Sequence, residues 1–158
     1  AKGVGVVTTP ENRWGRCDIK TIALLPNVLA RQKAKAAGAY EALFVDADGL
    51  VTEGAASNAW IIDQAGVLRT RDLGANILRG ITRATLMGVI AERQLKVEER
   101  AFTVEEAKSA KEVFITGAGA LILPVVAVDG QPIGDGKAGP VAKALREDYI
   151  RRARETAV

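Results

Sequence analysis

The sequence predicts a mixed α/β fold in which helices wrap a mixed β-sheet. About eight short β-prone segments are interleaved with three or four segments of helical periodicity. The two kinds of segment do not alternate strictly, as they would in a fully parallel sheet, so both parallel and antiparallel neighbours are expected. The chain has 158 residues, a length at which one domain can bury its own core.

The first elements are a strand and a helix. Residues 4–8 alternate glycine with β-branched residues and predict a strand that ends in a turn-prone sequence. Residues 24–39 predict a helix, because apolar residues recur three and four positions apart. Pro26 suits the first turn of this helix and Gly38 suits its C-terminal end.

Three short strands are expected next, over residues 40–45, 59–62 and 67–70. Turn residues separate them: Asp and Gly at 46–49, and Gln, Ala and Gly at 64–66. The stretch between the first two strands is interpreted as a loop, because it holds many small and polar residues.

The second half predicts a helix over residues 81–94 and a strand over 96–101. Thr103 followed by Glu106 matches a capping box, so a short helix is expected to begin there.

Two strands, over residues 112–116 and 121–128, come next. The last helix follows Pro140. It carries a basic rim of Arg146, Arg151, Arg152 and Arg154.

Composition excludes several classes of catalyst. The chain has no His and one Cys. A Ser/His/Asp triad, a Cys/His pair, a His-bearing zinc site and an intrachain disulfide are therefore excluded, and no metal site is expected. Any catalysis must depend on Lys, Asp or Glu, Tyr, Ser or Thr, or on a bound cofactor. Cys17 has no His to activate it and is interpreted as a structural thiol.

Charge and hydropathy indicate the kind of partner. Lys and Arg exceed Asp and Glu by 22 to 19, a net charge of +3 that is too small and dispersed to favour nucleic acid. No apolar run is long enough to span a membrane, and a cytoplasmic location is expected. The chain starts at Ala1 and reaches a β-prone segment almost at once, which favours one part of a longer protein.

Two features carry candidate reactive side chains. Lys20 lies between an apolar residue and the apolar start of a helix, a setting in which a lysine can act as a nucleophile or Schiff-base former. Glu53 precedes small and polar residues that let a backbone approach a ligand, and its carboxylate could pair with a cationic ring nitrogen. A solvated lysine and an ordinary loop glutamate are the alternatives.

Two further features suit an anion. Residues 76–83 lie at the start of a predicted helix, where free N–H groups and the Thr82 hydroxyl suit a phosphate. Helix capping by Thr82 is the alternative. Residues 116–120 contain two glycines between strands and could present N–H groups to an anion, although a plain tight turn is the more common explanation. They do not form a dinucleotide fingerprint, because Ile122 stands where a third glycine is required.

Taken in order, these features resemble the cofactor-binding domain of class IV pyridoxal-phosphate enzymes. The matching stretches are RxDIKT at 16–21, the Leu- and Ala-rich sequence LLPNVLARQKAKAAGAYEA at 24–42, TEGAASN at 52–58 and ILRGITR at 77–83. The group contains D-amino acid aminotransferases, branched-chain aminotransferases and aminodeoxychorismate lyases, and the first two stretches most resemble the D-amino acid enzymes. The resemblance implies a barrel-like mixed sheet wrapped by helices. It also implies that residues 1–158 form the larger C-terminal domain, with the N-terminal domain absent from this chain.

The resemblance implies a role for each candidate residue. Lys20 would form a Schiff base with pyridoxal 5′-phosphate and move the substrate proton, and Glu53 would keep the pyridine nitrogen protonated. Leu78 would pack on the ring. The remaining cofactor-binding residues would be Ser57, Asn58, Gly80, Ile81, Thr82, Gly117, Ala118 and Gly119. Ala55 and Ala56 depart from the hydroxyl side chains that many relatives carry.

The function implied is amino-group transfer between a D-amino acid and a 2-oxo acid, in an enzyme that forms a homodimer at full length. Alternatives within the family are a branched-chain aminotransferase and an aminodeoxychorismate lyase. Outside enzymology, the alternatives are a non-catalytic cofactor-binding module and nucleic-acid binding through the arginines of the last helix.

Overall fold

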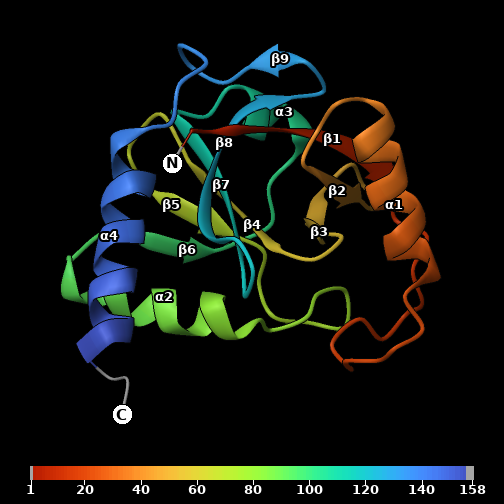
Figure 1. Cartoon of the computed structure of the whole chain (residues 1–158), viewed down its shortest axis with the longest axis horizontal. Coiled ribbons are helices and arrows are strands. Elements are labelled where there is room, and N and C mark those ends of the chain that lie inside the picture. Colours follow the sequence, from red (N-terminus) through yellow and green to blue (C-terminus); the bar gives the residue numbers. More distant parts are fainter. Residues whose placement is uncertain (1, 156–158) are drawn as a thin grey trace.

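The computed structural model describes residues 2–155, in which four helices lie against a nine-stranded mixed sheet (Figure 1). The strands are β1 (Val4–Pro10), β2 (Glu41–Val45), β3 (Val51–Gly54), β4 (Asn58–Ile62), β5 (Leu68–Thr70), β6 (Val97–Glu99), β7 (Glu112–Gly117), β8 (Leu121–Val128) and β9 (Gln131–Pro132). The helices are α1 (Leu25–Ala36), α2 (Ile81–Glu92), α3 (Val104–Lys108) and α4 (Pro140–Glu155).

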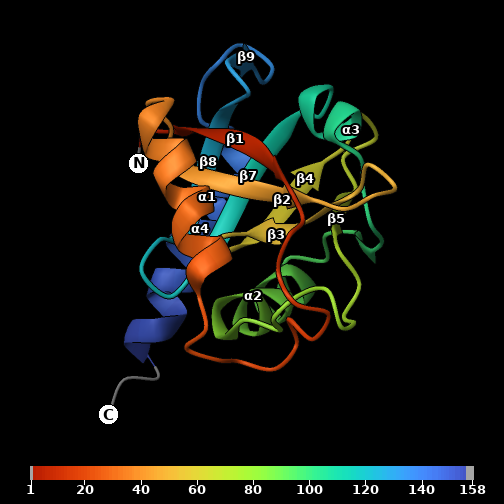
Figure 2. The same ribbon diagram turned by 90° about the vertical axis from the view of Figure 1, so that its right-hand side faces the viewer.

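The sheet is mixed and curled, as the sequence predicts. Its order is β3-β2-β1-β8-β7-β4-β5-β6, with β9 paired to β8. β1 runs parallel to both β2 and β8, β5 runs parallel to β6, and the other pairs are antiparallel. α1 packs on β1 and β2, whereas α2 and α4 pack on each other and on the β7–β8 region (Figure 2). Helices therefore cover the β1–β2 part and the central β7–β8 part of the curled sheet.

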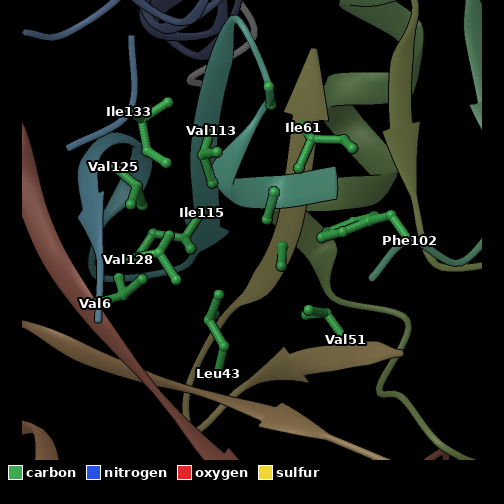
Figure 3. Packing of buried hydrophobic residues seen from close by; sticks show 13 residues of the cluster. Val6, Leu43, Val51, Ile61, Phe102, Val113, Ile115, Val125, Val128 and Ile133 are labelled. Carbon is green, nitrogen blue, oxygen red and sulfur yellow. The ribbon is translucent and has the colours of Figure 1, made fainter. Parts of the chain in front are cut away.

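Apolar side chains are buried on both faces of the central strands. Successive residues of a strand point to opposite faces, and along β4 Ile61 joins one apolar cluster while Trp60 and Ile62 join another. The first cluster fills the space between the curled sheet and α3 (Figure 3). The second lies under α2 and α4, where Trp60 stacks on Phe114 with ring centroids 5.6 Å apart. This two-sided burial explains why β4 is apolar from Ala59 to Ile62.

The structure confirms most of the expected elements. α3 begins with the capping box: the Glu106 N–H donates to Thr103 Oγ1 at 3.0 Å, and the Thr103 N–H donates to Glu106 Oε2 at 2.8 Å. Gly38, just past α1, has φ +71°, a conformation that favours glycine at the end of a helix. β1 extends two residues beyond its expected end, to Pro10.

Three differences are informative. β3 lies where a loop was expected, because its residues pair with β2 and are buried even though the sequence around them is small and polar. β9 was not expected and has only two residues. The apolar face of α1, which includes Leu25, Val28 and Leu29, is exposed, and α1 instead packs through its alanines.

The basic rim expected on α4 is largely paired. Arg146 donates to the carbonyl oxygens of Ala120 and Ile122 at 2.9 and 2.7 Å. Arg151 pairs with Asp148 on the same helix. Arg152 pairs with a glutamate of α2 at 2.5 Å. Arg146 and Arg152 thus join α4 to neighbouring elements, and Arg151 makes its contact within the helix.

The burial pattern predicts unequal effects for one substitution at two sites. Ile115→Ala is expected to lower the free energy of unfolding by about 2–5 kcal/mol, because it leaves a cavity in the core. Ile22→Ala is the matched control, expected to change it by under about 0.5 kcal/mol, since Ile115 is 0% exposed and Ile22 is 99% exposed. Urea unfolding followed by circular dichroism measures both, and equal losses would contradict the assignment of the core.

Candidate functional site

One cavity of about 920 Å³ brings the four sequence features together. Its wall combines the loop after β1, the turn between β3 and β4, the start of α2 and the turn after β7. It includes ten of the candidate residues: Lys20, Glu53, Ser57, Asn58, Leu78, Gly80, Ile81, Thr82, Gly117 and Ala118. Gly119 is not part of this wall, so the structure does not group it with the others.

Glu53 is a buried carboxylate in β3 that also lines the cavity. The Arg13 guanidinium donates to its Oε1 through Nη1 at 2.5 Å. The Asn58 amide donates to its Oε2 at 3.1 Å, and the Leu78 N–H lies 3.2 and 3.1 Å from the two oxygens. These donors come from three separate segments and hold the carboxylate in one orientation.

Burial dominates the ionisation of Glu53. Desolvation raises the pKa of its carboxyl to about 7, although the hydrogen bonds from Arg13 and the Leu78 N–H lower it and the nearby Glu11 carboxylate raises it further. A group poised near neutral pH can gain or lose a proton as the charge beside it changes. A cation placed next to Glu53 in the cavity would therefore favour its ionised form.

Arg13 and Asn27 line the site, but no pattern in the sequence selects them. Arg13 follows β1 at the edge where the parallel strands β1 and β2 both end, which is where side chains from separate strands meet. Asn27, in the first turn of α1, donates to the Ala55 carbonyl at 2.8 Å and ties the helix to the turn between β3 and β4. A single Arg in a loop carries no sequence signal. The one usable clue is that Arg13 follows β1, a strand that runs parallel to β2, because residues after parallel strands often meet in a site.

Lys20 lines the cavity from an irregular loop and is exposed. The loop is fixed nearby, because the Asp18 N–H donates to the Ala75 carbonyl at 3.3 Å and the Ile19 N–H donates to the Arg16 carbonyl at 3.0 Å. The apolar setting expected for Lys20 is not found. Ile19 on one side is 46% exposed and Ile22 beyond it is almost fully exposed, so no apolar layer of residues 2–155 covers the amine.

The start of α2 presents backbone donors to the cavity. Gly80 is the residue that precedes the helix, with φ +65°, and no side chain caps the helix. The first N–H groups of a helix have no partner within it, and the first turn of α2 holds no acidic residue. Capping by Thr82 is therefore not observed, and the N–H groups beginning at Ile81 suit an anion.

The turn between β3 and β4 is held in place by hydrogen bonds to Glu41. This buried carboxylate accepts from the Ala56 N–H at 3.2 Å and from the Ser57 hydroxyl at 3.3 Å. On the other side, a Cβ added to Gly117 would lie 2.8 Å from the Ala56 carbonyl oxygen, so the two turns pack backbone to backbone. Close packing of this kind fixes the shape of the cavity floor.

Some other kinds of site were not found within residues 2–155. No cluster of His, Cys, Asp and Glu there could hold a metal ion. None of the helices there combines the length and the apolarity needed to cross a bilayer. Cys17 is a buried free thiol whose pKa is raised chiefly by burial, as expected of a structural cysteine.

Comparison with known families identifies the family and its fold. Residues 3–128 match the family model described as amino-transferase class IV. The chain belongs to the class IV aminotransferase family. Enzymes of this family use pyridoxal 5′-phosphate, in agreement with the cofactor expected from the sequence.

Individual relatives agree with this class IV assignment. D-alanine aminotransferase from Bacillus licheniformis is 45% identical over 144 residues, which is 91% of this chain and 50% of the relative. A T.th. branched-chain amino acid aminotransferase, solved with N-(5′-phosphopyridoxyl)-L-glutamate, has a TM-score of 0.85 at 34% identity and covers 94% of this chain and 51% of that one. The same enzyme was solved with pyridoxamine 5′-phosphate. The chain thus spans about half the length of the relatives it matches.

The packing of the two turns predicts different tolerance at two nearby glycines. Gly117→Ala is expected to lower the free energy of unfolding by about 1–3 kcal/mol through overpacking against Ala56. Gly119→Ala is the matched control, since its added Cβ meets nothing within 4 Å. Urea titration of both variants tests this, and a Gly119→Ala loss equal to that of Gly117→Ala would contradict it.

The raised pKa of Glu53 predicts a pH dependence of stability. The pKa of the Glu53 carboxyl is about 7 in the folded chain and near the ordinary 4.5 in the unfolded chain. The folded chain therefore binds the carboxyl proton more tightly between these two pH values. The free energy of unfolding of the unaltered chain, relative to Glu53→Gln, should therefore fall as pH rises through this window. Urea titrations at several pH values measure the difference, and a flat or rising difference would refute the assignment.

Proposed function

We propose that the chain is the pyridoxal-phosphate-binding C-terminal domain of an aminotransferase that exchanges the amino group of a D-amino acid with a 2-oxo acid. One observation carries the proposal: the same cavity wall holds Lys20, the buried carboxylate of Glu53 and the uncapped start of α2. An amine, an acid and an anion-binding helix end are the three groups that this cofactor requires.

The donor set fits the cofactor at both of its polar ends. The uncapped start of α2 offers N–H groups and a positive dipole to a phosphate, and Gly80 keeps the approach open because it has no side chain. Glu53 offers a carboxylate, poised near neutral pH, to a ring nitrogen. Residues for a cation at one end and an anion at the other are thus present on one wall.

When bound, the cofactor supplies an aldehyde that condenses with amines and a ring that accepts electrons from the substrate α-carbon. Lys20 is the proposed catalytic residue: its Nζ would hold the cofactor and would move the proton at the substrate α-carbon. Glu53 would keep a proton on the ring nitrogen, because an adjacent carboxylate favours the cationic form.

Neighbouring residues orient these groups. Asn58 donates to Glu53 Oε2 and, at 2.9 Å, to the Leu78 carbonyl, so one side chain fixes the acid and the segment that would lie on the ring face. Ile81 and Thr82 would bind the phosphate through their backbone N–H groups. Ser57, Gly117 and Ala118 shape the polar edge of the cavity.

The choice of a D-amino acid is supported by the 45% identity to D-alanine aminotransferase, against 34% for the branched-chain enzyme. A branched-chain aminotransferase and an aminodeoxychorismate lyase remain the alternatives within the family. The chain's coverage of about half of each relative supports a second, N-terminal domain in the full-length enzyme.

The exposed apolar residues of the loop and of α1, such as Leu25 and Leu29, support burial against that domain or in a homodimer. The single buried thiol is consistent with the cytoplasm.

Covalent trapping tests the binding of the cofactor. The chain is mixed with pyridoxal 5′-phosphate, reduced with borohydride and digested, and the modified lysine is located by mass spectrometry. We expect the label on Lys20, its loss in Lys20→Ala, and its retention in Lys35→Ala, a control on the exposed face of α1. Absence of label at Lys20 in the unaltered chain would overturn the proposal.

Turnover distinguishes the alternatives. With 2-oxoglutarate as acceptor, the full-length enzyme is expected to consume D-alanine at least about tenfold faster than L-leucine, a difference of about 1.4 kcal/mol in the activation barrier. Faster reaction of L-leucine would indicate the branched-chain enzyme, and release of pyruvate from aminodeoxychorismate would indicate the lyase. Trapping at Lys20 without turnover of any substrate would favour the non-catalytic module.

A further inference from the structure

Arg13 is shared between two carboxylates. Its side chain is only 6% exposed and lies between Glu11 and Glu53. It makes a two-pronged contact with Glu11, through Nε at 2.8 Å and Nη2 at 2.6 Å, and a single contact with Glu53, through Nη1 at 2.5 Å. Two-pronged contacts between a guanidinium and a carboxylate are the stronger geometry.

The surroundings of Arg13 leave it little freedom. Its guanidinium carbon lies 4.4 Å from the centre of the Phe44 ring, and Nη2 also donates to the Asn76 carbonyl at 3.0 Å. Thr52 donates its hydroxyl to Glu11 Oε2 at 2.8 Å, so Glu11 is fixed as well. These contacts hold the guanidinium between the two carboxylates.

Charges around this group do not balance. With both carboxylates ionised, Glu11, Arg13 and Glu53 together carry one negative charge next to the cavity. Glu11 is held ionised: burial raises the pKa of its carboxyl, but hydrogen bonds from Arg13 and Thr52 outweigh burial and bring it below the ordinary value. Glu53 is thus the member of the group that responds to a cation in the cavity.

We infer that Arg13 is a positioning residue that orients Glu53 toward the cavity and favours its ionised form, and that Glu11 sets how much of the Arg13 charge acts on Glu53. The inference rests on the proposed role of Glu53 beside the cofactor's ring nitrogen. A guanidinium bound to Glu53 alone would neutralise that carboxylate and weaken its hold on a ring cation. Because Arg13 is also bound to Glu11, its charge neutralises Glu53 only in part, and Glu53 can accept a second cation.

Other charged or titratable groups near Glu53 must be considered in any pH measurement. They are Cys17, Lys20 and Arg79 on the cavity wall and Glu41 next to Gly54. None of these has a hydrogen bond or ion pair with Glu53 in the part of the chain that the structure describes. Glu11 and Arg13 are therefore the substitutions that act on it most directly.

The inference predicts opposite shifts for two substitutions. Glu11→Gln leaves the guanidinium to Glu53 and removes a nearby negative charge, so the titration midpoint of Glu53 should move down. Arg13→Gln leaves Glu53 buried without its cation, so the midpoint should move up. Adding Glu11→Gln to the Arg13→Gln variant should shift the titration midpoint of Glu53 less than Glu11→Gln does in the unaltered chain, because Arg13 no longer links the two carboxylates.

Carbon-13 NMR of the glutamate carboxyls in the cofactor-free chain measures these midpoints, with Glu53→Gln to assign the signal. Arg16→Gln is the matched control: it removes the same charge from the same loop, and Arg16 pairs with Asp18 instead of Glu53. We expect no shift in the control. An unchanged midpoint in Glu11→Gln, or an upward one, would overturn the inference.

A second measurement separates this inference from the proposed function. Arg13→Gln should weaken binding of pyridoxal 5′-phosphate at pH 7 by at least about tenfold, equivalent to one pKa unit. If the unaltered chain fails to bind the cofactor while the midpoints move as expected, the proposed function fails and the Glu11–Arg13 relation stands. If the cofactor is trapped on Lys20 while the midpoints stay fixed, only the inference fails. Should Arg13→Gln not fold by circular dichroism, the isosteric Glu11→Gln decides alone.

Discussion

A buried carboxylate at the edge of an open cavity is the constraint around which this domain is arranged. Glu53 is 5% exposed, and a buried ion costs several kcal/mol unless it is paired and hydrogen-bonded. Its donors are Arg13 from the loop after β1, Asn58 from β4 and the N–H of Leu78 before α2. Burying this one group therefore requires the strand edge, the neighbouring strand and the start of the helix to be in register with one another.

The start of α2, at the other end of the cavity, depends on the same Asn58 side chain. Asn58 donates both to Glu53 and to the Leu78 carbonyl, and a Cβ on Gly80 would lie 2.1 Å from the Asn58 amide oxygen. Glycine at position 80 thus serves two needs, a positive φ before α2 and room for the amide that orients Glu53. The anion-binding helix end and the acidic end are linked through a single side chain, and neither can be moved alone.

Local patterns predicted the regular elements, and tertiary contacts decided the rest. Helical spacing, turn glycines and the Thr103 capping box have local causes, so α2, α3 and most strands could be predicted from the sequence. β3 could not, because Thr52 and Glu53 are polar and only the pairing with β2 buries them. Arg13 could not be predicted as a site residue for the same reason, since its partner Glu53 lies 40 residues further along the chain. The order of the four motifs along the chain predicted which residues meet in the cavity. The exposure of Lys20 and the position of Gly119 outside the cavity wall depend on the conformation of loops, which no sequence pattern predicts.

The place of β1 in the sheet governs the order in which the domain can be assembled. β1 joins β3-β2 on one side to β8-β7-β4-β5-β6 on the other, and its partner β8 is encoded more than a hundred residues later. Closing such a long loop is entropically costly and slow. During synthesis the first strand must wait, paired on one edge only, until most of the chain has left the ribosome. Glu11 and Arg13 follow directly after that strand, so the acidic end of the cavity is attached to an element whose second edge is paired only when β8 is available.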